Sequence, residues 1–176
     1  MDIKSRILSR KVVFVYFYQK YFMEEIWNNE LFFEDILEIE KIINYKSITK
    51  EALSELKNNI VNLYDSSNYE SDVLYIKYNF FEYNKSTLDF EYIDLMINSY
   101  DKYKTDVENI VNDHVDSFKY QEMDMIDKTI FLLWYIENNE IGTPKQVILN
   151  EMINIAKKYW DNSSYKLINW IGHKII

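Results

Sequence analysis

Apolar side chains recur near the start of the chain at the spacing of an α-helix. Ile7, Phe14, Phe17 and Tyr21 are separated by seven, three and four residues, which places them on one helical face. We therefore expect a core-facing helix from residue 5 to about residue 27. The same kind of periodicity predicts further helices over 34–43, 48–64, 90–103, 105–118 and 123–137.

Residues 73–88 are rich in aromatic and branched apolar side chains and fit a helix or a strand equally well by pattern. The whole chain holds only two glycines and one proline, and strands joined by tight turns usually need more of both. We therefore favour a helix here, after a polar loop over 65–72. The pattern as a whole predicts an all-α fold.

The last part of the chain shows a helix start and a break. Thr143 can cap a helix, Pro144 has the backbone angle wanted in the first turn, and Gln146 stands where a capping box closes. The polar stretch 161–164 then separates this helix from a final one. The final helix is expected to bury Leu167, Trp170 and Ile171, with Asn169 as its one awkward polar residue.

Length and composition predict one domain over residues 1–176, built of two helical halves, 1–88 and 89–176. The chain has no cysteine, which excludes disulfides and thiolate metal sites and fits a cytoplasmic protein. No apolar run reaches the length of a membrane span, and no signal peptide is recognisable. We expect no membrane partner.

Charge is distributed unevenly along this acidic chain, whose net charge is −9. Residues 1–20 carry five basic side chains against one acidic, a net +4, and residues 145–176 carry five against two, a net +3. The segment between them therefore holds −16. The two basic ends could form one local patch if the fold joins them, or two separate solvated helix faces.

Residues suited to catalysis are scarce. The two histidines, His114 and His173, are far apart, and the sequence has neither an HExxH motif nor a glycine-rich phosphate loop. Acidic pairs such as Glu38 with Glu40 have the spacing of ordinary solvated faces. We predict a binding protein that is not an enzyme and needs no cofactor or metal.

The C-terminal stretch resembles the signature of the NusB family. That family reads approximately as a proline, then Lys-Val and Ile-Asn-Glu, a helix ending in Ala-Lys, a polar loop, and Lys-Phe-Val-Asn-Gly. This chain has Pro144, Gln146-Val147, Leu149-Asn150-Glu151, Ala156-Lys157, Ser164 and Lys166-Leu167-Ile168-Asn169. Trp160 and Trp170 stand where the family usually has glycine.

Two upstream segments extend the resemblance. Residues 126–131, Ile-Asp-Lys-Thr-Ile-Phe, resemble the family's Leu-Asp-Arg-Ala-Ile-Leu helix. Arg10, followed by Phe17-Tyr18-Gln19, resembles the family's arginine followed by Leu-Tyr-Gln. His114 stands where members often carry His or Tyr. Residues 24–90 offer no usable match.

The resemblance implies a NusB-like domain of two packed helical sub-bundles and a role in transcription antitermination. It further implies binding to boxA-type RNA of nascent ribosomal transcripts together with NusE, a small-subunit ribosomal protein, within the transcription elongation complex. The RNA-binding residues it suggests are Lys4, Arg6, Arg10, Lys11, His114, Lys166 and Leu167. The NusE-facing residues it suggests are Tyr18 and Asp127.

Two other interpretations stay open at this point. One is a diverged NusB-like adaptor that keeps a protein partner without specific RNA recognition, because the basic cluster at the start of the chain has only two arginines. The other is an unrelated helical interaction domain. For Arg6 and Arg10 the alternative to RNA contact is two solvated side chains on one helix face.

Overall fold

The computed structural model describes residues 3–28, 49–66, 69–79, 87–159 and 164–175. Every regular element within these ranges is helical, which confirms the predicted all-α fold. The predicted helix over 34–43 lies outside the described residues. The α-helices are α1 (Ile3–Asn28), α3 (Lys50–Ser66), α4 (Glu70–Asn79), α5 (Phe90–Asn98), α6 (Tyr100–His114), α7 (Met125–Ile136), α8 (Lys145–Tyr159) and α9 (Ser164–Ile175). A 3₁₀ turn, η2 (Tyr120–Glu122), precedes α7, and a π-helical turn, η3 (Glu137–Ile141), follows it.

The chain divides into two compact units. The larger unit combines Met1–Tyr18 with Tyr69–Ile176, and the smaller unit is Gln19–Asn68. This division differs from the expected halves, 1–88 and 89–176, because the start of α1 packs with the C-terminal helices. In the smaller unit, the described side chains of α3 are mostly exposed.

No helix in the described part of the chain has both the length and the apolar character needed to cross a bilayer.

The core of the larger unit begins with one face of α1. Leu8, Val12, Val13 and Phe17 of this helix are fully buried. The ring of Phe17 lies 5.1 Å from the ring of Tyr100 at the start of α6, centroid to centroid. The predicted apolar stripe is therefore the packing face, although Ile7 at its edge is only half-buried.

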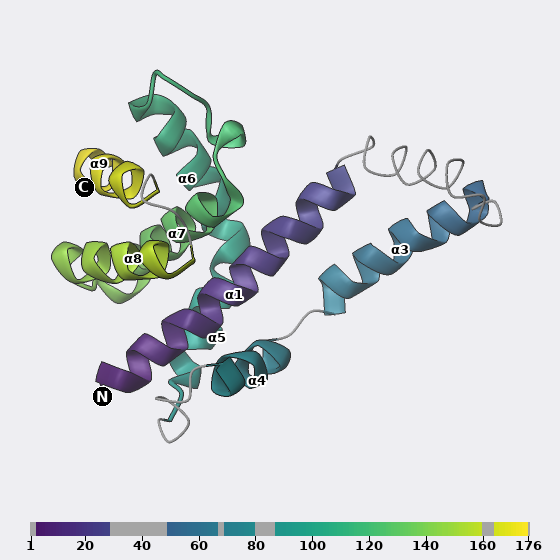
Figure 1. Ribbon diagram of the computed structural model, residues 1–176, viewed down its shortest axis with the longest axis horizontal. Coiled ribbons are helices and arrows are strands. Elements are labelled where there is room, and N and C mark those ends of the chain that lie inside the picture. Colours follow the sequence, from purple (N-terminus) through teal and green to yellow (C-terminus); the bar gives the residue numbers. More distant parts are fainter. Residues whose placement is uncertain (1–2, 29–48, 67–68, 80–86, 160–163, 176) are drawn as a thin grey trace. The chain divides into compact units, whose positions relative to one another are not determined.

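Helix α7 is the central helix of the C-terminal part of the larger unit. Figure 1 shows α6, α8 and α9 gathered around it, and it contacts each of them. Its side chains are buried on nearly every face, as expected of a helix that is apolar all round. The carboxylate of Asp124 begins the helix by accepting a hydrogen bond from the N–H of Ile126 at 3.0 Å.

Several predicted boundaries are wrong by a few residues. The stretch 65–72, predicted as a loop, is largely helical: α3 runs to Ser66 and α4 starts at Glu70. Glu70 and Asp72 lie in the first turn of α4, where acidic side chains are favoured by the helix dipole. The break between α5 and α6 falls at Ser99 instead of residue 104. The prediction of helix over 73–88 is confirmed as far as Asn79.

The C-terminal hairpin is formed by α8 and α9. The carbonyl of Pro144 accepts hydrogen bonds from the N–H groups of Val147 and Ile148, so α8 begins where predicted. A Cβ atom at Gly172 of α9 would lie only 2.5 Å from Cδ2 of Leu149, which shows how closely the two helices approach. Trp170 was expected in the core, but it is 43% exposed, while its neighbour Ile171 is buried.

Candidate functional site

Arg10 and Glu137 form a buried ion pair between α1 and the first residue of η3. Nε of Arg10 donates to Oε2 of Glu137 at 2.9 Å, and Nη2 donates to Oε1 at 2.6 Å. Arg10 is 5% exposed and Glu137 is fully buried. Two parallel charge-assisted hydrogen bonds of this kind are both strong and geometrically specific.

Two hydroxyl groups complete what we call the buried arginine cluster: Arg10, Tyr92, Thr143 and Glu137. The hydroxyl of Tyr92 in α5 donates to Oε2 of Glu137 at 3.0 Å, and that of Thr143 donates to Oε1 at 3.0 Å. Thr143 thus bonds to Glu137 with the hydroxyl that was expected to cap α8. The chain turns at Gly142, whose φ of 67° favours glycine, and this turn brings Thr143 back beside the Glu137 side chain.

The electrostatics of the cluster raise the pKa values of Arg10 and Tyr92. Burial acts to lower the pKa of Arg10, but its hydrogen bonds to Glu137 and the charge of that carboxylate outweigh burial, so the pKa is raised. Burial, together with the charge of Glu137, holds the pKa of Tyr92 well above its usual value. The cluster therefore fastens α1, α5 and the η3 turn together through the hydrogen bonds that Glu137 accepts.

The burial of Arg10 bears on its predicted role. Its guanidinium group is bonded to Glu137 and lies beneath the surface, so this structure does not present it to a ligand. The solvated arginine considered as the alternative does not describe it, and its RNA contact stays a prediction. Arg10 belongs to the framework that positions the end of α1 nearest the N-terminus.

Arg6 lies one helical turn before Arg10 and stays at the surface. Nη2 of Arg6 is 3.1 Å from Oδ2 of Asp89, and its guanidinium carbon lies 4.1 Å from the centre of the Tyr92 ring. The side chains of Arg6 and Asp89 are 21% and 16% exposed. Tyr92 therefore links the two arginines: its ring faces Arg6, and its hydroxyl bonds to Glu137, the partner of Arg10.

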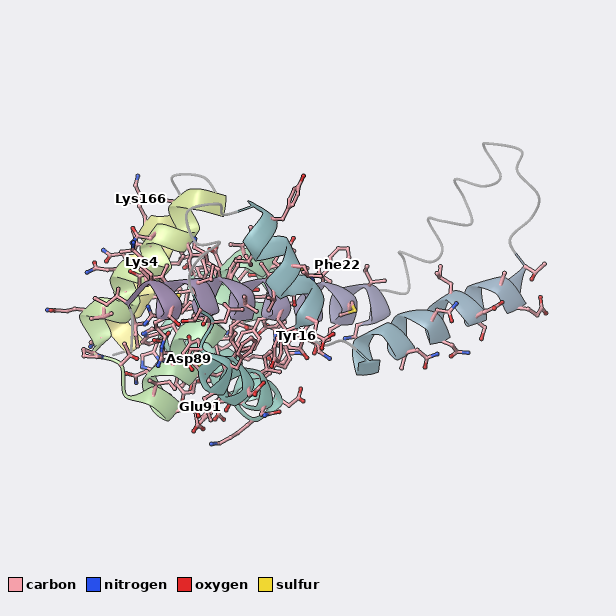
Figure 2. The ribbon with its side chains drawn as sticks, turned by 90° about the horizontal axis from the view of Figure 1, so that it is seen from below. Lys4, Tyr16, Phe22, Asp89, Glu91 and Lys166 are labelled. Atoms are coloured by element: carbon pink, nitrogen blue, oxygen red, sulfur yellow. The ribbon has the colours of Figure 1, made fainter. Side chains whose placement is uncertain are left out.

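An open pocket of about 530 Å³ lies beside Arg6. Its lining includes Arg6, Asp89, Glu91 and Tyr92, so charged groups of both signs face it. Figure 2 shows Lys4, Asp89 and Glu91 toward the N-terminal end of α1. We call this region the Arg6 surface. It consists of Lys4, Arg6, Asp89 and Glu91 and of the open pocket that Arg6, Asp89, Glu91 and Tyr92 line.

The other predicted RNA-binding residues are spread over the larger unit. Lys11 is half-buried on α1, and His114 is exposed at the end of α6, with Nδ1 2.8 Å from the carbonyl oxygen of Ile110. On α9, Lys166 is exposed and Leu167 is half-buried. Figure 1 shows the C-terminal end of α9 apart from the N-terminal end of α1.

The two predicted partner-facing residues differ in exposure. Tyr18 is exposed on α1, as a partner contact requires. Asp127 was expected to be an exposed acidic residue, but it is 4% exposed in the first turn of α7. That position favours an acidic side chain through the helix dipole. The expected exposure of Asp127 is therefore wrong, and its partner contact stays a prediction.

Sequence reasoning missed Glu137, Tyr92 and Asp89. Glu137 gave a signal, because it directly follows the apolar segment of α7 and a carboxylate there must find a charged partner when buried. Tyr92 and Asp89 gave no such signal, because the sequence around them does not indicate that α1 packs beside them. Among the described residues, no group of three or more acidic or histidine side chains could hold a metal ion.

Comparison with known proteins gives the chain its family. The NusB family model matches residues 9–171. A transcription antitermination protein NusB from Macrococcus caseolyticus is 33% identical over 73 residues, 42% of this chain and 56% of that protein. Its counterpart from Clostridium botulinum is 24% identical over 137 residues, 77% of this chain and 92% of that protein. The Clostridium novyi protein of that name is 25% identical over 136 residues, 74% of this chain and 86% of that protein.

No solved structure was found to match the chain. The matched range includes Arg10, Tyr92 and Glu137, all of α8 and the first part of α9. The chain therefore belongs to the NusB family.

Proposed function

We propose that the protein is an RNA-binding transcription antitermination factor that acts with NusE on boxA-type RNA in the elongation complex. The observation that carries the proposal is the family match over residues 9–171, supported by relatives named transcription antitermination proteins.

The Arg6 surface is the region best suited to meet RNA. Lys4 is exposed, and Arg6 presents a planar guanidinium group at the rim of an open pocket. Guanidinium groups bind phosphates and also stack on unpaired bases, which is how single-stranded RNA is commonly recognised. Lys11, His114, Lys166 and Leu167 stay predicted RNA contacts, and Arg10 does not enter the proposal.

The net charge of −9 gives a reason for a basic partner. An acidic protein attracts a basic ribosomal protein through complementary charge, and the partner then supplies positive surface for the RNA backbone. Tyr18, exposed on α1, is the described residue that we propose for the partner contact. Aromatic side chains of this kind are common at the centres of protein interfaces.

The test is a titration of boxA RNA and a scrambled RNA of equal length with the protein, alone and with purified NusE. We expect a ternary complex that prefers boxA. Arg6→Ala should weaken it about tenfold, the loss expected for one charge-assisted contact. Lys119→Ala, which also removes one exposed positive charge, is the control and should change affinity less than threefold.

Equal affinity for boxA and scrambled RNA would contradict the proposal. A second candidate function, a protein adaptor without specific RNA recognition, is favoured by one observation: only one of the chain's two arginines reaches the surface, and it is already paired to Asp89. Binding of NusE with no difference between the two RNAs would favour that adaptor.

A further inference from the structure

Asp89 forms an ion pair with Arg6 beside the open pocket. Oδ2 of Asp89 is 3.1 Å from Nη2 of Arg6, at the wall of the open pocket. Its other oxygen, Oδ1, accepts the N–H of Tyr92 at 3.1 Å and so caps α5. The backbone N–H of Asp89 donates to the hydroxyl of Ser9 at 2.9 Å, which fixes the residue against α1.

We propose that Asp89 is the residue that limits the RNA affinity of the Arg6 surface, because its carboxylate competes with an RNA phosphate for the Arg6 guanidinium group. This inference rests on the proposed RNA binding and names an affinity-determining contact within it. A phosphate that approaches Arg6 meets a second negative charge at ion-pair distance. It must displace that carboxylate or share the guanidinium group with it.

The geometry indicates that the Asp89 carboxylate competes with phosphate for Arg6, and that it is not needed to position the guanidinium group. The contacts of Arg6 include the ion pair to Asp89 and the ring of Tyr92 at 4.1 Å. The Tyr92 ring belongs to the buried arginine cluster and stays in place without the Asp89 charge. Removal of that charge therefore leaves Arg6 stacked and positioned, with a stronger local attraction for phosphate.

Asparagine at position 89 separates the charge from the other roles of this residue. It has nearly the same size as aspartate, it caps helices equally well, and it keeps the backbone N–H that bonds to Ser9. We expect Asp89→Asn to tighten RNA binding about tenfold at low salt, the effect of one removed charge at this distance. The slope of log affinity against log salt should steepen by about 0.7, one additional phosphate contact on a single strand.

Two controls make the result specific. Asp106→Asn makes the same substitution at an exposed aspartate of α6 that does not line the pocket, and it should change affinity by less than threefold. In an Arg6→Ala background, Asp89→Asn should lose its effect, since the guanidinium group for which the two anions compete is gone. Asp89→Ser, another uncharged capping residue, serves if the asparagine variant does not fold.

The outcomes are distinct. Unchanged or weaker RNA binding by folded Asp89→Asn and Asp89→Ser would overturn the inference, and so would an equal gain in Asp106→Asn. A gain that persists in the Arg6→Ala background would also overturn it. No preference of the unsubstituted protein for boxA over scrambled RNA, with or without NusE, would overturn the proposed function itself, and this inference with it.

Discussion

Replacement of Glu137 by glutamine is expected to lower the free energy of unfolding by about 3–5 kcal/mol, the range for removing one partner of a buried ion pair. The reason is Arg10, which is 5% exposed and would keep its charge in the interior without a counter-ion. The hydroxyls of Tyr92 and Thr143 would also lose a charged acceptor. Urea unfolding followed by circular dichroism measures the loss.

The pair itself is tested by a double-mutant cycle. Arg10→Met alone leaves the carboxylate of Glu137 buried and unpaired, whereas Arg10→Met with Glu137→Leu removes both charges at once. Replacing both ions with apolar side chains is often close to neutral, so the double variant should be more stable than either single variant. Strictly additive losses would show that the two side chains do not stabilise each other.

Truncation of Phe17 to alanine is the second large effect, a loss of about 3–5 kcal/mol. Phe17 is fully buried on α1, and its ring is 5.1 Å from that of Tyr100 in α6. The substitution opens a cavity between segments that are far apart in sequence, so it should loosen the attachment of α1. Urea unfolding gives the free energy, and hydrogen exchange along α1 locates it.

Phe22 is the matched control for Phe17. It is the same residue type on the same helix, but it is exposed. Phe22→Ala should cost less than about 1 kcal/mol, because little apolar surface returns to water. Equal losses for the two variants would mean that the burial of Phe17 does not anchor the helix.

The helices could be predicted from sequence where one face carried the signal. The apolar stripe of α1 and the proline at the start of α8 correctly predicted helices, because periodicity and caps are local properties. Boundaries failed where the local signal was weak. The break at Ser99 lies between two amphipathic helices without glycine or proline, and Trp170 is exposed although it lies within an apolar run.

The candidate site was only half predictable, for a physical reason. Arg6 and Arg10 are four residues apart, and this spacing correctly places both on one face of a helix. Sequence cannot tell what covers that face. Glu137, more than a hundred residues away, covers Arg10 and forms an ion pair with it. Arg6 instead lines the open pocket together with residues at the start of α5. The exposure of Asp127 was wrongly predicted for the same reason, because its burial depends on which helices pack against α7.

The two arginines therefore have different roles in this account. Arg10 fastens α1 to the η3 turn from below the surface, whereas Arg6, paired with Asp89, is the arginine that we propose for the RNA contact. A substitution that removes Arg10 together with its counter-ion makes the two roles separable, because it leaves no unpaired charge in the core.

The most direct test is the boxA RNA affinity, in the presence of NusE, of the Arg10→Met, Glu137→Leu double variant, measured beside Arg6→Ala. The two proteins are first shown to be folded by circular dichroism and thermal melting. The account predicts affinity within about threefold of the unsubstituted protein for the double variant and a loss of about tenfold for Arg6→Ala. A folded double variant that loses as much affinity as Arg6→Ala would contradict it, because Arg10 would then itself contact the RNA.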